Sequence, residues 1–158
     1  MRAIMKSAIF VAIFAATMTG TVQSQGTSAG ASATFVFRKA YDRGLGFGSS
    51  TAQSYYHLPA GVCQGRRRLA SFSWLSGAER ERQLPAGAPV TLWMSTMRAS
   101  GAWRSNCGKS VRFTPRPGAT YDVALRAVVG SHCEASVVDR STGQAPADLS
   151  FDDKLDCG

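Results

Sequence analysis

Residues 111–129 have the sequence VRFTPRPGATYDVALRAVV, and this stretch decides the fold. From Tyr121 onward, apolar and polar side chains alternate, which predicts a strand with one buried face. The apolar positions of this strand are Tyr121, Val123, Leu125, Ala127 and Val129. The preceding TPRPG segment predicts a turn, because proline lacks the N–H that a central strand needs.

The rest of the chain shows the same alternation in short pieces. Strands are predicted at 33–38, 69–75, 90–96, 111–113, 121–129, 132–140 and 149–151. Segments 41–60, 77–83 and 97–108 have no regular period, so we expect loops or turns there. No helical period holds outside the first 24 residues. Short strands separated by Gly/Pro turns predict an all-β fold, an antiparallel Greek-key sandwich of about seven strands.

The first residues have the features of a secretory signal peptide. Arg2 and Lys6 precede an apolar run at 8–18, and Val22 and Ser24 lie at −3 and −1 of a plausible cleavage point. The run is shorter than the roughly 20 residues that span a bilayer, so we expect cleavage rather than anchoring. The predicted organisation is a signal peptide at 1–24, a flexible lead-in at 25–32 and one domain at 33–158. A periplasmic or secreted location follows, with no membrane span after processing.

Four cysteines, Cys63, Cys107, Cys133 and Cys157, lie in the predicted mature chain. An even number in an oxidising compartment predicts two disulfides. The cysteines are far apart in the sequence, so no C-x-x-C pair suggests a metal site, and no cofactor is expected. Three pairings are open. We expect Cys63 with Cys107 and Cys133 with Cys157, since each would join neighbouring segments.

Charge is unevenly distributed along the chain. It has 18 Lys+Arg and 10 Asp+Glu, a formal net charge of +8, and the excess of basic residues lies before residue 127. The last 32 residues are acidic, with Asp148, Asp152, Asp153 and Asp156. This asymmetry indicates attraction to an anionic partner, a tail that folds back onto the basic part, or simple solubility. Nucleic acid is not an expected partner of an exported chain.

Basic and aromatic residues are the candidates for binding. The Arg66-Arg67-Arg68 triplet can clamp phosphate or carboxylate, or form a solvated turn. Aromatic rings beside polar residues can stack on a sugar or a base, although Trp103 can instead cover the Cys107 disulfide. The candidate binding residues are Tyr55, Tyr56, Arg66, Arg67, Arg68, Trp103 and Arg104.

No catalytic motif is complete. The G-x-S-x-G match at 26–30 lies beside the cleavage site, outside any strand–helix context. The Gly108-Lys109-Ser110 sequence lacks the first glycine of a P-loop. His57 and His132 have no local partner that suggests a triad. We therefore predict that the protein is not an enzyme and assign no catalytic residue.

The 111–123 sequence, together with Leu84-Pro85-Ala86-Gly87 and Cys133, resembles small uncharacterised exported proteins of Gram-negative bacteria. The resemblance covers roughly residues 84–140 and implies an Ig-like or transthyretin-like sandwich. It also implies a tyrosine corner, in which the Tyr121 hydroxyl ties the preceding turn to the backbone.

These observations favour a non-enzymatic module for binding or assembly in the cell envelope. One alternative is an electrostatic binder of an anionic surface polymer through an arginine-rich face. Another is an inhibitor of a secreted hydrolase, which would present the loops expected at 41–60 or 97–106. The partner is accordingly an envelope protein or an anionic polymer.

Overall fold

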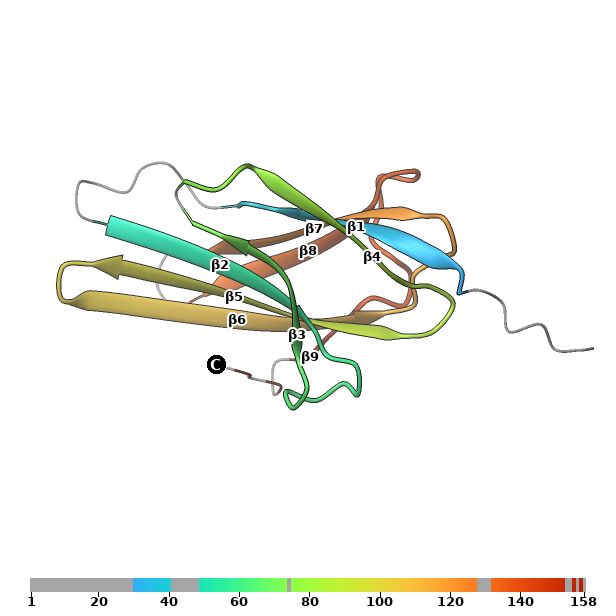
Figure 1. The fold of residues 1–158 in the computed structure, drawn as a ribbon, viewed down its shortest axis with the longest axis horizontal. Helices are drawn as coiled ribbons and strands as arrows, with labels where there is room; N and C mark the ends of the chain where they lie inside the picture. Colours follow the sequence, from blue (N-terminus) through green and yellow to red (C-terminus); the bar gives the residue numbers. More distant parts are fainter. Residues whose placement is uncertain are drawn as a thin grey trace, which may run out of the picture.

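The structure is a computed structural model, and it describes residues 30–40, 49–73, 75–127, 132–152, Leu155 and Cys157 (Figure 1). Ser49 and Trp103 are described by their backbone alone. The predicted signal peptide and most of the lead-in lie outside these residues. Within them there is no helix and there are nine strands: β1 Ser32–Arg38, β2 Ser49–His57, β3 Arg67–Phe72, β4 Glu79–Pro85, β5 Val90–Ser100, β6 Trp103–Phe113, β7 Thr120–Ala127, β8 Cys133–Asp139 and β9 Ser150–Asp152.

The strands form two sheets. Sheet A has four strands in the order β4-β1-β7-β8, and sheet B has five in the order β3-β2-β5-β6-β9. Figure 1 shows β2, β5 and β6 side by side as the long strands of sheet B. The all-β prediction is confirmed, but there are more strands than the seven expected. The pairing is also not wholly antiparallel, because β1 pairs with β7 in parallel.

The extra strands lie where no regular period was found. β2 lies within the loop expected at 41–60, and β5 and β6 extend through the loop expected at 97–108. β4 replaces the turn expected at 77–83. Its ERER sequence is exposed on both faces, as is usual for an edge strand that carries charge to resist pairing with other chains. Apolar alternation cannot reveal such a strand.

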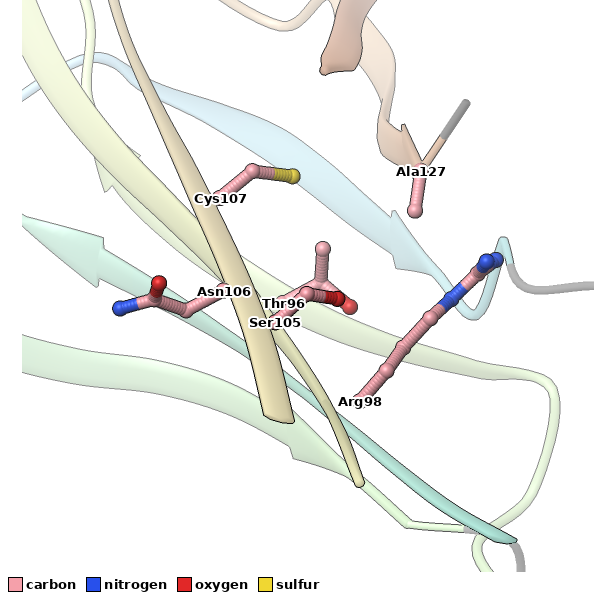
Figure 2. A pocket seen from close by; sticks show the side chains of 6 residues that line it. All are labelled: Thr96, Arg98, Ser105, Asn106, Cys107 and Ala127. Carbon is pink, nitrogen blue, oxygen red and sulfur yellow. The ribbon is translucent and has the colours of Figure 1, made fainter. Parts of the chain in front are cut away.

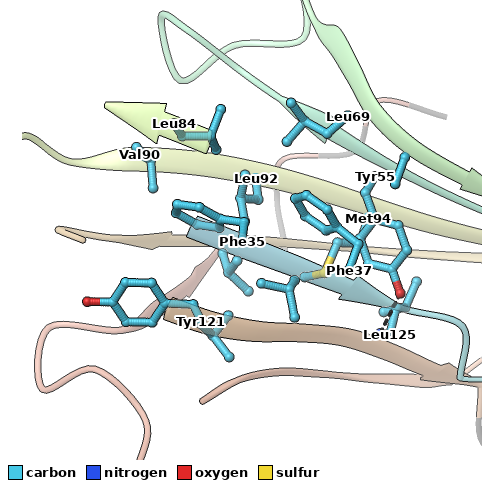
Figure 3. Packing of buried hydrophobic residues seen from close by; sticks show 14 of the residues in the cluster. Phe35, Phe37, Tyr55, Leu69, Leu84, Val90, Leu92, Met94, Tyr121 and Leu125 are labelled. Atoms are coloured by element: carbon cyan, nitrogen blue, oxygen red, sulfur yellow. Dashed lines mark hydrogen bonds between the residues drawn. The ribbon is translucent and has the colours of Figure 1, made fainter. Parts of the chain in front are cut away.

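One hydrophobic core takes side chains from both sheets (Figure 3). Phe37 of β1 contacts Tyr55 of β2, with ring centroids 5.1 Å apart. The ring centroids of Phe113 in β6 and Tyr121 in β7 are 5.1 Å apart, and the two rings meet edge to face. The predicted inward positions Val123 and Leu125 are fully buried. Contacts between aromatic rings therefore hold the inner face of sheet A against that of sheet B.

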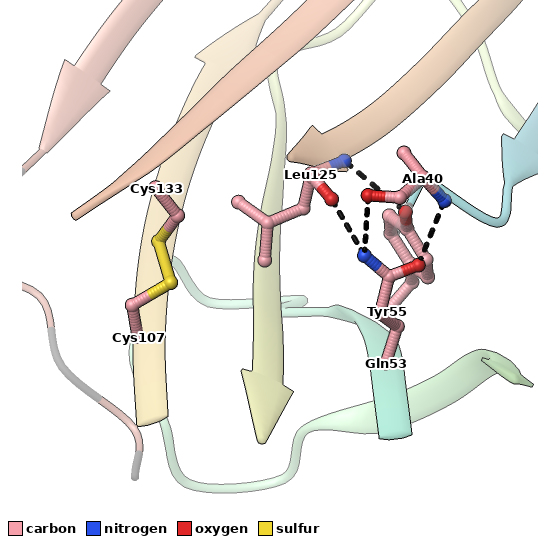
Figure 4. The surroundings of a disulfide bond; sticks show 6 residues. All are labelled: Ala40, Gln53, Tyr55, Cys107, Leu125 and Cys133. Atoms are coloured by element: carbon pink, nitrogen blue, oxygen red, sulfur yellow. Dashed lines mark hydrogen bonds between the residues drawn. A yellow bond between two sulfur atoms is a disulfide. The ribbon is translucent and has the colours of Figure 1, made fainter. Parts of the chain in front are cut away.

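Two β2 side chains join the sheets by buried hydrogen bonds (Figure 4). The Gln53 amide donates to Leu125 O at 2.6 Å, and its oxygen accepts from Ala40 N at 3.0 Å. The Tyr55 hydroxyl donates to Arg38 O at 2.7 Å and accepts from Leu125 N at 3.2 Å. The register of β1 with β7 ends at Arg38 and Ala124. Gln53 and Tyr55 therefore satisfy the backbone groups just beyond that pairing.

The turn before β7 has the hydrogen bond expected of a tyrosine corner. Arg116 N donates to the Tyr121 hydroxyl at 2.9 Å. Gly118 completes this turn at φ 72°, a left-handed conformation that favours glycine, and its N–H donates to Ser32 O at 2.8 Å. The turn thus fixes both the start of β7 and the start of β1.

Both disulfides are present, but the predicted pairing is wrong. The bonds join Cys63 to Cys157 and Cys107 to Cys133. Cys107 and Cys133 belong to the core between the sheets, whereas Cys63 and Cys157 belong to a second cluster around Trp93. These clusters lie on opposite faces of sheet B, because Trp93 follows the core residue Leu92 in β5. A bond between Cys63 and Cys107 would have to pass through the sheet.

Candidate functional site

The inner face of sheet B changes from apolar to polar along its strands. Antiparallel pairing places inward residues of β2, β5 and β6 in rows across the sheet. His57, Leu92 and Val111 form one row at the apolar end. The two rows at the other end are polar: Gln53–Thr96–Cys107 and Thr51–Arg98–Ser105.

A small pocket opens at this polar end (Figure 2). Its enclosed space has room for about one water-sized group, and the surrounding space of about 190 Å³ includes open solvent. The pocket therefore suits one functional group rather than a whole ligand. Its lining residues are Thr96, Arg98, Ser105, Asn106, Cys107 and Ala127.

Several buried polar atoms at this end have no hydrogen-bond partner within the described residues. They are Thr51 Oγ1, Thr96 Oγ1 and Arg98 Nε. Thr51 and Thr96 are 4% and 3% exposed, whereas Arg98 is half-buried. Figure 2 shows Arg98 extending toward Ala127 while Asn106 points to the opposite side of β6. We call Thr51, Thr96, Arg98 and Ser105 the polar mouth.

The sequence pattern does not predict the polar mouth. Thr51 lies in the segment expected to be a loop, and Arg98 and Ser105 lie in another. The spacing of these residues along their strands is the signal that would predict the site. Thr51 is two residues from Gln53, and Arg98 is two residues from Thr96. Each pair continues the inward alternation of the same strand, but with polar side chains.

Tyr55 and Tyr56, predicted together as surface stacking residues, point to opposite faces of sheet B. Tyr55 is fully buried in the core, so its prediction as a surface binding residue is wrong. Burial raises the pKa of Tyr55 to about 12, although the hydrogen bond from Leu125 lowers it. Tyr56 lies on the outer face, 5.8 Å from the Trp93 ring. The two neighbours therefore have different roles.

Arg66 joins the outer aromatic cluster. Its guanidinium lies 5.2 Å from the centre of the Tyr56 ring and donates a hydrogen bond to Cys157 O. Leu155 and Cys157 pack with Trp93, which is 4% exposed. Leu155 and Cys157, the described end of the chain, therefore lie beside Arg66 and its aromatic neighbours. Asp153 and Asp156 lie outside the described residues.

The other two arginines of the triplet start β3. Arg68 pairs with Tyr56, and Arg67 pairs with His57. Partial burial lowers the pKa of His57, and the positive charge of Arg67 lowers it further. The pKa shift favours the neutral imidazole. Arg67 and Arg68 are both exposed.

Arg104 lies far from the triplet. It pairs with Ala99, which pairs with Ser50, whereas Arg68 pairs with Tyr56 at the other end of β2. Six residues of extended strand separate these positions, roughly 20 Å. Trp103 lies next to Arg104 in β6, but its side chain is outside the described part. The predicted binding residues therefore do not form one site.

Charge divides between the two sheets. The described strands of sheet A carry four basic and five acidic residues: Arg38, Arg80, Arg82, Arg126, Glu79, Glu81, Asp122, Glu134 and Asp139. Those of sheet B carry six basic residues and one acidic residue: Arg67, Arg68, Arg98, Arg104, Lys109, Arg112 and Asp152. Positive charge therefore accumulates on sheet B. We call Arg66, Arg68, Arg104 and Arg112, on its outer side, the basic face.

Several charges on sheet A neutralise one another. Asp122 accepts hydrogen bonds from Arg140 and Arg38, each with a contact of 2.9 Å. These interactions, that with Arg140 most strongly, lower the pKa of Asp122. Asp139 contacts Arg116 at 2.6 Å and also accepts from Ser141. The basic face shows no comparable ion pairs among the residues described.

Three further observations concern metal binding, membrane spans and similarity to known proteins. No group of three or more His, Cys, Asp or Glu side chains with metal-binding geometry occurs in the described ranges. None of these ranges contains a helix long and apolar enough to cross a membrane. No protein-family model and no curated protein sequence matches the chain. Function is therefore inferred from the residues and their geometry.

Proposed function

We propose that the chain is a non-enzymatic binding module of the cell envelope, an exported Ig-like sandwich that receives an anionic polymer on its basic face. The uneven division of charge between the two sheets carries this proposal. The signal-like first residues and the two disulfides support an oxidising compartment outside the cytoplasm, periplasmic or secreted.

The shape of the outer face supports a polymer as the partner. Between Arg104 and the Tyr56–Trp93 pair, the outward positions of the basic face hold mostly small residues: Ala52, Ser54, Ser95, Asn106 and Gly108. Met97 projects from the same face and is 54% exposed. An extended chain can lie across such a surface and meet arginines at both ends, so that several weak charge contacts add.

The positions of the arginines also favour a repeating anion over a compact one. Arg68 and Arg104 lie at opposite ends of the face, about six strand residues apart. One sulfate or phosphate group cannot contact both, whereas a polymer with charge on each unit can. An assembly partner with an acidic surface is the second form of the same proposal, because the charge pattern would recognise it in the same way.

The test measures binding of the chain from residue 25 onward to heparin, an anionic polysaccharide probe, over a series of salt concentrations. We expect the logarithm of affinity to fall linearly with the logarithm of salt concentration, because bound cations are released. The triple variant Arg68→Gln/Arg104→Gln/Arg112→Gln should reduce the slope by about 2–3, roughly one for each lost contact.

Arg80→Gln/Arg82→Gln/Arg126→Gln is the matched control. These three arginines are also exposed, but they lie on strands of sheet A. The control should keep the salt slope of the unmodified chain. Equal slopes for both triple variants would show that net charge alone drives binding, and salt-independent binding would contradict the proposal.

A further inference from the structure

We propose that the polar mouth binds a single carboxylate group, held by two N–H donors of Arg98 and by the hydroxyl of Thr96. The polar mouth lies on the inner side of sheet B, whereas the basic face lies on the outer side. This inference is therefore independent of the proposed function, and variants can separate the two.

Unsatisfied polar atoms concentrate at the polar mouth. Buried side-chain polar atoms in proteins nearly always have a hydrogen-bond partner, and leaving one unpaired is costly. Of the six such atoms in the described residues, Thr51 Oγ1, Thr96 Oγ1 and Arg98 Nε lie in two adjacent rows of the sheet. Thr96 and Arg98 also line the pocket, so a ligand there can supply the missing acceptor.

The chemistry of the lining selects an anion. Among the residues that the structure describes, no acidic side chain lines the pocket, and Arg98 is the charged residue of its lining. Thr96 and Ser105 contribute hydroxyl groups, which can donate to an anionic oxygen. A neutral ligand would leave the guanidinium without a counter-charge at a half-buried position.

The form of the donors favours a carboxylate. The Nε and one Nη of arginine present two parallel N–H groups, which match the two oxygens of a planar carboxylate. Arg98 Nε is the buried atom that lacks a partner, so this side-on pairing fills the observed deficit. The enclosed space is about the size of one water, so it receives one carboxylate oxygen while the second oxygen and the carrier lie at the open mouth.

Nearby interactions hold the polar mouth in place. Gln53, in the same row as Thr96, bonds to Leu125 of the opposite sheet, and Cys107 of that row is bonded to Cys133. The row that lies deeper than Arg98 is thus fixed by a hydrogen bond and by a covalent bond (Figure 4). A ligand therefore meets donors on rigid strands, which reduces the entropy lost on binding.

Two carriers can present this carboxylate: a small free acid or the end of a polypeptide. The test uses ¹⁵N-labelled protein and follows the Nε–Hε signal of Arg98, assigned by its absence in Arg98→Lys. Sodium acetate is titrated against sodium chloride at equal ionic strength. A short peptide with a free C-terminal carboxylate is compared with the same peptide as its amide.

We expect a saturable shift of this signal with acetate and with the peptide acid, but not with chloride or the amide. Tighter binding of the peptide acid than of acetate would identify a polypeptide carrier, and equal affinity would identify a small acid. Affinity in Arg98→Lys, read from backbone signals, should fall by about tenfold or more, because lysine keeps the charge but loses the two-donor geometry.

Arg112→Lys, on the outer face, is the matched control and should keep the affinity of the unmodified chain. Thr96→Val should weaken binding a few-fold, and it carries the test if Arg98→Lys does not fold. A shift that is the same in acetate and chloride, or equal binding by the Arg98 and Arg112 variants, would overturn the inference.

Discussion

The side-chain amide of Gln53 in sheet B donates to the carbonyl of Leu125 in sheet A, 2.6 Å away in the buried interior. The oxygen of the same amide accepts from Ala40 N at 3.0 Å. The Gln53 side chain therefore pairs with two backbone groups: the N–H of Ala40, just after β1, and the carbonyl of Leu125 in β7. Its position, next to the apolar core and behind the polar mouth, joins the stable part of the fold to its candidate site.

Gln53→Leu should destabilise the fold by roughly 2–4 kcal/mol. The substitution leaves the Leu125 carbonyl and the Ala40 N–H without their partner in a buried place, and such groups cost about 1–3 kcal/mol each. Urea unfolding followed by circular dichroism measures the change. Ser54→Ala, on the opposite face of β2, should change stability by less than about 0.5 kcal/mol. Equal stability of Gln53→Leu and the unmodified chain would contradict the structural role of Gln53.

Asp139 should make the fold sensitive to acid. Its hydrogen bond to Arg116, and then those to Ser141, lower its pKa from 3.8 to about 2. The folded state therefore favours the carboxylate more than the unfolded chain does. The stabilisation is complete above the unfolded pKa and is lost as the pH falls from about 4 to about 2. Asp122, whose pKa is also lowered, acts in the same direction.

Asp139→Asn tests this dependence. We expect the variant to be less stable than the unmodified chain near neutral pH, and the difference to shrink toward zero as the pH approaches 2. Urea unfolding at a series of pH values gives both curves. A difference that stays constant across the acid range would show that the titration of Asp139 does not contribute.

The strands with apolar alternation could be predicted from the sequence, and those with polar inward positions could not. Tyr121, Val123 and Leu125 are buried as expected, because an apolar residue at every second position has one favourable face. β2 has Thr51 and Gln53 at inward positions, so the same rule did not find it. Their burial depends on partners distant in sequence, such as Leu125, which no local pattern contains.

The candidate site follows the same logic. Residue type alone makes Arg66, Arg68 and Arg104 binding candidates, and all three are exposed on the outer side of sheet B. The sequence does not single out Arg98, because this residue stands alone in a segment without a regular period. Its environment comes from its row neighbours Thr51 and Ser105, which lie on two other strands. Residue type is thus enough to predict the charged surface. The pocket depends on the strand register, which places Thr51, Arg98 and Ser105 in one row.

Gly108→Ala should destabilise the fold by about 1–3 kcal/mol, because an added Cβ would lie 2.8 Å from Trp93 Cζ2. The indole lies directly over Gly108, so the ring or strand β6 must move. Calorimetry should show a lower Tm, and the indole N–H signal of Trp93 should shift. Asn106→Ala is the control, because Asn106 lies two residues before Gly108 on the same face of β6. This variant should leave the Trp93 signal in place. An unchanged signal in Gly108→Ala would contradict this packing.

The two disulfides should have separable effects, because they lie on opposite faces of sheet B. Cys63→Ser/Cys157→Ser and Cys107→Ser/Cys133→Ser should each lower stability by roughly 3–5 kcal/mol in the chain-entropy account. The outer pair alone should also uncover Trp93, since Cys157 packs against it. In a Trp74→Phe/Trp103→Phe background, where Trp93 is the remaining tryptophan, its emission should shift to longer wavelength below the Tm.

The inner pair is the matched control for that measurement. Cys107→Ser/Cys133→Ser should lower the Tm while leaving the emission of Trp93 unchanged in the folded state, because this bond lies in the core between the sheets. Peptide mapping without reduction should recover the two bridged pairs, Cys63 with Cys157 and Cys107 with Cys133. A red shift caused by the inner pair alone would place Trp93 on the wrong face of sheet B. It would also remove the separation between the basic face and the polar mouth on which both proposals depend.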